Sequence, residues 1–251
     1  MTLAVEHVGP TPGGGSVPLV FLHGFTQTGR SWLPVVERLG RHRTCTLVDA
    51  PGHGDSPDGA RSLWECADDI STTAGPGVLV GYSMGARMAL HCVLAHPHRW
   101  HGLVLVSGTA GIDDGEERAA RRTDDEHLAD RIEEIGVERF LDEWLTQPLF
   151  AGLSPAMADR GDRLRNTARG LADSLRHAGT GTQEPLWDRL EEISVPVLVV
   201  TGERDAKFTD LGRRLTRGID GALLIVVPGA GHTVHLERPD AFADALVDWL
   251  G

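Results

Sequence analysis

The residues best suited to chemistry lie around Ser83. Residues 81–85 read Gly-Tyr-Ser-Met-Gly, and they connect an apolar run at 77–80 with a segment of helical character that begins at Ala86. Glycines two positions before and after the serine permit a tight strand-to-helix turn, because no Cβ crowds it. Such a turn would present the Ser83 hydroxyl in a cleft and direct the helix N-terminus at negative charge developing beside it. We therefore predict an activated serine at this position.

A carboxylate and a histidine follow the serine, each in a loop behind a strand-like run. The run 195–201 leads into Glu203 and Asp205, and a later apolar run ends in a glycine-rich loop that carries His232. Serine, acid and histidine in this order can form a triad in which the imidazole takes the serine proton and the acid fixes its tautomer. We assign the acid to Asp205 rather than to Glu203.

Each of these residues also has a structural interpretation. Asp205 could cap a helix that begins at Ala206. His232 and His235 could form half of a metal site, but no further ligand stands at a suitable spacing. We therefore predict no metal and interpret His235 as a structural neighbour. The order of the three residues behind their strands favours catalysis.

Two backbone amides are candidates for an oxyanion hole. Residues 22–25 read Leu-His-Gly-Phe directly after a strand-like run. The N–H groups of Phe25 and Met84 could point at one oxyanion, and each such donor contributes about 3 kcal/mol to transition-state stabilisation. The stretch 49–56 has turn chemistry, and His53 within it is interpreted as structural.

Short apolar runs separated by glycine and proline turns and by helical patterns indicate an α/β fold. Most of these runs are continuous in valine and leucine, as expected for a mostly parallel, doubly wound sheet with helices on both faces. The turn at Ser83 and the order of elements resemble the α/β-hydrolase fold. The glycine-rich stretch 11–16 is interpreted as a turn between the first two strands. The predicted strands span 3–8, 18–22, 44–48, 78–81, 102–107, 195–201 and 222–227.

The segment 110–190 differs from the rest of the chain. It has no strand-like run, it is rich in arginine, aspartate and glutamate, and apolar residues such as Leu141 and Trp144 follow helical spacing. We expect a helical lid inserted into a core formed by residues 1–109 and 191–251, all within a single domain. A lid of this kind shapes the substrate pocket and excludes water.

Arg87 stands four residues after Ser83, on a similar face of the predicted helix and one turn further along. A neutral ester gives no reason for a guanidinium there. A carboxylate-bearing substrate does, because arginine binds carboxylates with a planar fork. The alternative is a structural salt bridge to a carboxylate of the lid.

Composition limits the classes of partner. The net charge is −12, which argues against nucleic acid and anionic membranes, and no apolar run approaches the length of a membrane span. The first residues do not resemble a signal peptide, and the three cysteines imply no disulfide framework. We predict a cytoplasmic enzyme without a cofactor that acts on a small anionic molecule as a monomer or small homo-oligomer.

Longer motifs resemble one family of this fold, the 2-succinyl-6-hydroxy-2,4-cyclohexadiene-1-carboxylate synthases of menaquinone biosynthesis. The serine turn continues as Gly-Ala-Arg to Arg87, and the resemblance spans nearly the whole chain. Its most specific pieces are Gln-Pro-Leu-Phe at 147–150 and Gly-Thr-Gly-Thr-Gln at 179–183. Further matching segments lie at 116–121, 164–166, 202–208 and 231–237.

The resemblance implies a lyase that eliminates pyruvate from a cyclohexene bearing a succinyl ketone, an enolpyruvyl ether and a ring carboxylate. Ser83, Asp205 and His232 would act as a base relay that removes the proton α to the ketone. The amides of Phe25 and Met84 would hold the resulting enolate oxygen.

The resemblance also implies a set of substrate-binding residues, in which three arginines serve three carboxylates. A local arginine cluster would outweigh the negative net charge, because the nearest charges dominate the field in a low-dielectric cleft. In the third arginine position, Arg163 and Arg169 are alternatives to Arg165. The implied residues are Arg87, Arg121, Arg165, Tyr82 and Trp144.

Two other functions stay open at this point. A serine hydrolase of the same fold, either a carboxylesterase or a carbon–carbon bond hydrolase, would share the triad, the oxyanion hole and the preference for carboxylates. A binding module that has lost catalysis would keep the pocket, although the complete triad argues against it.

Overall fold

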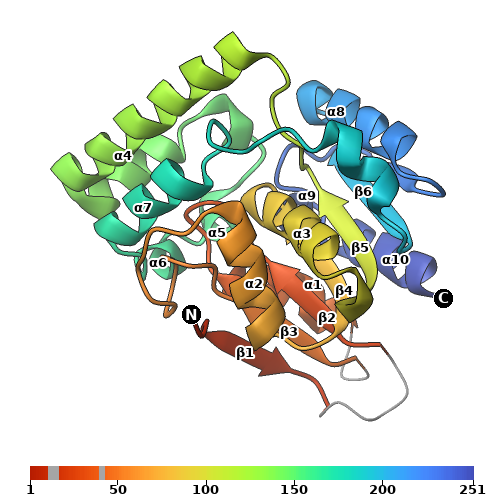
Figure 1. Cartoon of the computed structure of the whole chain (residues 1–251). Coiled ribbons are helices and arrows are strands. Elements are labelled where there is room, and N and C mark those ends of the chain that lie inside the picture. The colour runs from red at the N-terminus through yellow and green to blue at the C-terminus, as the bar shows by residue number, and fades with distance from the viewer. Residues whose placement is uncertain (11–16, 40–42) are drawn as a thin grey trace.

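A seven-stranded sheet forms the centre of the computed structural model, which describes residues 1–10, 17–39 and 43–251 (Figure 1). The strand order is β1-β3-β2-β4-β5-β6-β7, with β1 antiparallel to β3 and the other pairs parallel. The predicted α/β class is confirmed, and every predicted strand is present with small shifts at its ends. The turn predicted at 11–16 lies outside the described residues. The strands are β1 (Val5–Val8), β2 (Leu19–Leu22), β3 (Cys45–Val48), β4 (Gly77–Tyr82), β5 (Trp100–Val106), β6 (Val197–Gly202) and β7 (Leu223–Val227).

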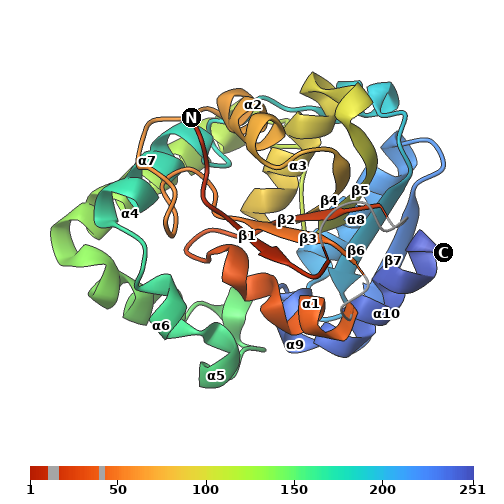
Figure 2. The ribbon, with the colours of Figure 1, turned by 90° about the horizontal axis from the view of Figure 1, so that it is seen from below.

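Helices cover both faces of the sheet (Figure 2). One face packs against α2 (Leu63–Thr73), α3 (Met84–Ala95) and α8 (Ala206–Gly218). The other face packs against α1 (Leu33–Leu39) and α10 (Pro239–Leu250). Strands β2, β3, β4 and β6 are buried along their whole length for this reason, which explains their continuous apolar sequences.

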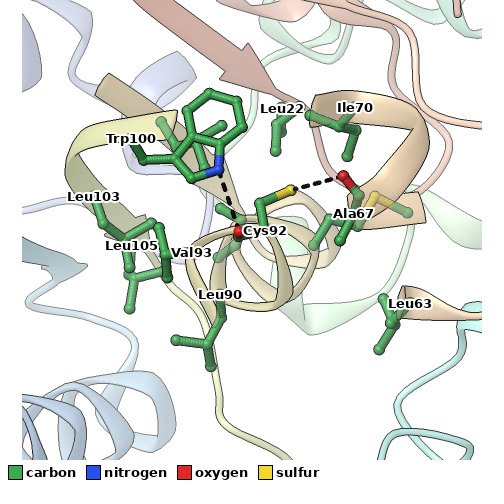
Figure 3. Packing of buried hydrophobic residues seen from close by; sticks show 14 of the residues in the cluster. Leu22, Leu63, Ala67, Ile70, Leu90, Cys92, Val93, Trp100, Leu103 and Leu105 are labelled. Carbon is green, nitrogen blue, oxygen red and sulfur yellow. Dashed lines mark hydrogen bonds between the residues drawn. The ribbon is translucent and has the colours of Figure 1, made fainter. Parts of the chain in front are cut away.

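Figure 3 shows part of the apolar core, in which residues of β2, α2, α3 and β5 pack together. The indole N–H of Trp100 on β5 donates to the carbonyl of Cys92 on α3 at 3.2 Å. The Cys92 thiol lies 3.8 Å from the carbonyl of Ala67 on α2, and burial raises the pKa of this thiol. Close packing of this kind gives the loop at the end of β4 a rigid support.

The chain between β5 and β6 forms a helical lid (Figure 1). Its two long helices, α4 (Gly115–Trp144) and α7 (Ala168–Ala178), lie side by side and share a small apolar cluster that includes Ile132 and Leu171. The helical conformation of α4 is interrupted at Gly136, whose φ is 77°. A positive φ of this size favours glycine, because glycine has no Cβ that would clash with the backbone.

Short helical segments complete the described part of the chain. None of its helices is long and apolar enough to cross a membrane. These segments are η1 (Gly29–Trp32), η2 (Pro97–Arg99), η3 (Pro148–Phe150), α5 (Pro155–Ala158), α6 (Arg160–Arg163), η4 (Trp187–Glu192) and α9 (Val234–Glu237).

Candidate active site

Ser83 occupies the sharp turn between β4 and α3, with φ of 52° and ψ of −106°. A positive φ is uncommon for a residue with a Cβ and marks local strain, here held by the surrounding backbone. A Cβ at Gly81 would come within 2.3 Å of the Gly85 carbonyl oxygen, and a Cβ at Gly85 within 2.2 Å of the Leu22 carbonyl oxygen. The two glycines of the motif are therefore required by close backbone approach.

The ends of β4, β6 and β7 bring the three predicted triad residues together. The His232 Nε2 atom lies 3.3 Å from the Ser83 Oγ, and the His232 Nδ1 atom lies 2.6 Å from the Asp205 Oδ2. Asp205 also caps α8, because its Oδ1 accepts a hydrogen bond from the Phe208 N–H at 3.3 Å. Asp205 thus has both of the roles considered for it, and the cap fixes its carboxylate toward the imidazole.

The loop after β2 holds Phe25 beside the serine. The Gly24 N–H donates to the Gln27 Oε1 at 3.0 Å, and the Gln27 N–H donates to the Gly24 carbonyl at 3.1 Å. The ring of His23 accepts the Ala50 N–H at its Nε2 (3.0 Å) and faces the Gly24 carbonyl with its Nδ1 (2.8 Å). Burial lowers the pKa of His23 to about 4, so this imidazole is neutral and serves as a structural bridge.

Met84 is the first residue of α3, where backbone amides have no partner within the helix. The preceding Ser83 makes no side-chain cap hydrogen bond to these amides. Its hydroxyl faces His232 instead. Met84 and Phe25 both line the same cavity as Ser83, and the convergence of their N–H groups on one oxyanion stays a prediction.

Two further histidines are packed into the protein. His53 is 1% exposed, and burial lowers its pKa to about 3. His235 is fully buried between the rings of Trp32 and Tyr82, with centroid distances of 4.2 and 4.5 Å. Neither ring lines the cavity, and burial lowers the pKa of His235 as well.

A cavity of about 750 Å³ opens between the lid and the carboxyl ends of the strands. Ser83 and His232 line it on the core side, and Trp144 lines it on the lid side. Tyr82 also lines it, and its hydroxyl lies 3.1 Å from the Thr233 Oγ1. The cavity size suits a small organic molecule.

Two buried arginines line this cavity. Arg87 is 7% exposed, and one of its terminal nitrogens donates to the Ala178 carbonyl at 2.7 Å. No carboxylate of the described residues lies within 4.0 Å of Arg87, so the alternative of a structural salt bridge does not hold there. Arg163 is 2% exposed and donates to the Ala158 carbonyl and to the Thr26 hydroxyl. Burial lowers the pKa of each of these two arginines to about 10, which shows the cost of holding the charge there.

Arg121 lines the cavity from α4 and pairs with the buried Asp125 at 2.8 Å. Arg165 does not line it. Its guanidinium donates hydrogen bonds to Asp162 at 3.0 Å and to Asp55 at 2.5 Å, and neither of these acids lines the cavity. The assignment of Arg165 to the pocket is therefore corrected to Arg163, and Arg169 is also absent from the lining.

Among the residues of the cavity wall that sequence reasoning did not identify, two lie directly after Asp205. Phe208 places its ring 4.4 Å, between centroids, from the ring of His232. Lys207, the only lysine of the chain, also lines the cavity. Their position directly after Asp205 on α8 was the available signal, because the first turn of a helix behind the acid must lie close to the triad.

Acidic side chains also reach the cavity, all from the start of the lid. They are exposed, whereas Arg87 and Arg163 are buried. Charges in a low-dielectric interior act more strongly than charges screened by water, so the inner part of the cavity favours an anion. The acids are Asp113, Asp114, Glu117 and Asp124.

Comparison with known proteins gives consistent matches. A model of the alpha/beta hydrolase family matches residues 19–245. The chain is 34% identical to the 2-succinyl-6-hydroxy-2,4-cyclohexadiene-1-carboxylate synthase of Serratia proteamaculans (strain 568), over 92% of either sequence. It is 38% identical to a Bacillus subtilis (strain 168) protein provisionally given the same synthase name, over 98% of this chain and 94% of that protein.

Solved structures are similar over the same length. MenH from S. aureus superposes with a TM-score of 0.89 at 29% identity, covering 100% of this chain and 98% of that one. A thermophilic esterase from Thermogutta terrifontis, with malate bound, superposes with a TM-score of 0.85 at 25% identity, covering 99% of this chain and 92% of that one.

Proposed function

The chain belongs to the alpha/beta hydrolase family and, within it, to the 2-succinyl-6-hydroxy-2,4-cyclohexadiene-1-carboxylate synthases, and from this membership we propose that it is the pyruvate-eliminating lyase of menaquinone biosynthesis. The substrate would be 2-succinyl-5-enolpyruvyl-6-hydroxy-3-cyclohexene-1-carboxylate. The observation that carries the proposal is the buried guanidinium of Arg87 on the wall of the cavity that holds Ser83, with no carboxylate of the described residues within 4.0 Å. A neutral substrate would give no compensation for burying that charge.

The reaction begins with proton removal. His232 Nε2 accepts the proton of the Ser83 hydroxyl, and the Ser83 oxygen removes the proton at C2 of the ring, α to the succinyl ketone. Asp205 holds the imidazole through its Nδ1 and stabilises the imidazolium. A positioned base relay of this kind contributes about 10²–10⁴-fold to the rate.

The electron pair then moves through the conjugated system. It is first held as an enolate, whose oxygen accepts hydrogen bonds from the N–H groups of Phe25 and Met84. Re-formation of the ketone makes the C2–C3 double bond, the ring double bond moves from C3–C4 to C4–C5, and the C5–O bond breaks. Pyruvate leaves as its enolate and takes up a proton, so no water is added.

Three arginines would bind the three carboxylates of this substrate. Arg87 and Arg163 contribute buried charges, and Arg121 contributes a partly exposed one from the lid. Arginine suits this role because its planar fork matches the carboxylate geometry. Tyr82 and Trp144 would line the ring of the substrate.

We propose the cytoplasm as the place of action and a small anionic molecule as the partner. Cys45, Cys66 and Cys92 are free and buried, which suits a reducing compartment. A monomer or small homo-oligomer stays a prediction, to be tested by light scattering.

The test is pyruvate release by the purified chain from the proposed substrate, measured beside hydrolysis of a short p-nitrophenyl ester. We expect rapid pyruvate release, weak esterase activity, and loss of at least 10³-fold of the pyruvate release in Ser83→Ala, because the relay loses its base. Substrate affinity in Ser83→Ala should persist, since the arginines are intact.

The second candidate is a serine hydrolase with a carboxylate-binding pocket. It is favoured by the similarity to the malate-bound esterase, and the same triad can form an acyl-enzyme. Rapid ester turnover without pyruvate release would select this candidate and reject the lyase.

A further inference from the structure

A buried carboxylate lies directly behind His232 and has no part in the mechanism described so far. Glu237, at the end of α9, is 3% exposed. Its Oε2 accepts the Gly231 N–H at 2.7 Å, and its Oε1 accepts the Thr233 N–H at 3.1 Å. The two oxygens of one side chain therefore hold the backbone on both sides of the histidine.

In the part of the chain that the structure describes, no cationic side chain pairs with this carboxylate. Among the described residues no arginine, lysine or histidine nitrogen lies within 4.0 Å of it, and Arg238 donates to the Glu237 backbone carbonyl instead. Burying an unpaired carboxylate is costly unless hydrogen bonds compensate it. Two charge-assisted bonds from amides supply that compensation and are stronger than neutral hydrogen bonds.

The lid closes over the same carboxylate. A Cβ at Gly152, in the lid connection after η3, would come within 2.0 Å of the Glu237 Oε2. Only a hydrogen atom fits between the lid backbone and the carboxylate, so the lid shields it from water. Electrostatic interactions are stronger in such a dry environment.

The His232 carbonyl is held from a third side, since it accepts the Ser107 hydroxyl at 2.8 Å. Asp205 holds the imidazole, and Ser107 holds the carbonyl of His232. Glu237 holds the N–H groups of the two neighbouring residues, Gly231 and Thr233. The distance of 3.3 Å from His232 to Ser83 depends on this support.

We propose that Glu237 is a positioning residue for proton transfer. It fixes the backbone around His232 and places a carboxylate beside the residue that carries the imidazole, which favours the imidazolium formed when Ser83 gives up its proton. The proposal rests on the triad of the proposed function and not on the identity of the substrate.

The experiment measures phosphonylation of Ser83 by a fluorophosphonate as a function of pH, in wild type and in Glu237→Gln. Glutamine keeps the shape but offers only one acceptor, and its amide group meets the second N–H as a donor. We expect a fall of about 10-fold or more in the maximal rate. The pH midpoint should move to lower pH, because removal of a negative charge favours neutral imidazole.

Asp69→Asn is the matched control. Asp69 is also a buried carboxylate, 7% exposed, but it lies on α2 and pairs with Arg61. Its substitution should leave rate and midpoint unchanged. Binding of the reaction product should be unaltered in Glu237→Gln, because the arginines are intact, whereas general damage to the site would weaken it.

Gly152→Ala gives an independent perturbation from the lid, at an exposed residue that has no positive φ. Its methyl group should displace the Glu237 carboxylate and lower the rate several-fold, and this variant decides the matter if Glu237→Gln does not fold. The proposal is overturned if folded Glu237→Gln reacts at the wild-type rate and with the wild-type pH midpoint. If only Gly152→Ala folds, the same result in that variant overturns it. Phosphonylation that depends on Glu237 in a protein that releases no pyruvate would reject the lyase function and keep this inference.

Discussion

At the scale of single residues, two arginines of the same short segment have opposite surroundings. Arg163 points into the cavity from α6, whereas Arg165 pairs with acids outside it. Arg163 is the last residue of α6 and Arg165 lies in the turn after it, and only one of the two, Arg163, lines the cavity. The sequence could not show which, because Asp159 starts α6 in a left-handed conformation, with φ of 43°, that no spacing rule predicts.

Substitution of the arginines tests this assignment. Arg87→Ala should lower kcat/KM for the proposed substrate by about 100-fold, because a buried charge-assisted hydrogen bond contributes roughly 1.5–3 kcal/mol. Arg165→Ala should have little effect, since its guanidinium contacts only lid and loop acids on a partly exposed face. Steady-state kinetics of both variants measure the difference. Equal losses in the two would contradict the placement of the cavity.

At the scale of elements, the core was predictable and the lid was less so. Strands buried on both faces have continuous apolar sequences, so β2, β3, β4 and β6 could be recognised directly. The triad followed from the loops behind β4, β6 and β7. The lid was predictable only as helical, because its helices are short or kinked and their ends depend on tertiary packing.

The kink of α4 gives a test at this scale. Gly136 has φ of 77° and nothing within 4 Å of an added Cβ, so alanine there meets backbone strain alone. We expect Gly136→Ala to destabilise the lid by about 1–3 kcal/mol, because φ of 77° with ψ of 164° is a conformation that essentially only glycine adopts. Faster limited proteolysis within 110–190 would report this loss.

Gly115→Ala is the matched control for this substitution. Gly115 also has open space around it, but no positive φ, and it begins the same helix. Alanine there should stabilise the helix by up to about 1 kcal/mol. If both variants were cleaved at equal rates, the positive φ at position 136 would carry no cost for alanine.

At the scale of the whole molecule, the negative net charge and an anionic substrate are compatible. The charge of −12 is a property of the complete chain, and the acids that reach the cavity are exposed. The buried arginines act at short range and in a drier environment, so they dominate binding once the substrate is inside. The family predicted from the sequence motifs is confirmed by relatives that match nearly the entire chain.

Buried neutral histidines make the stability of the whole fold depend on pH. Burial lowers the pKa of His23 to about 4, of His53 to about 3 and of His91 to about 4, from 6.5. Below pH 6.5 the unfolded chain takes up protons that the folded protein cannot accept until the pH approaches these lower values. The free energy of unfolding should therefore fall as the pH decreases from about 6.5 to 4, by up to about 1.4 kcal/mol per pH unit for each histidine.

Urea unfolding at pH 7.5 and pH 5, in wild type and two variants, measures this effect. His91 is buried beside Trp64, and its Nδ1 donates to the Arg87 carbonyl at 2.7 Å, so His91→Gln removes one of the buried histidines whose pKa is lowered. Its loss of stability between the two pH values should be smaller than that of wild type. His98→Gln, at an exposed histidine, should lose as much stability as wild type. An equal loss in His91→Gln and wild type would show that other groups govern the acid sensitivity, because the proton uptake of His91 on unfolding would then be negligible.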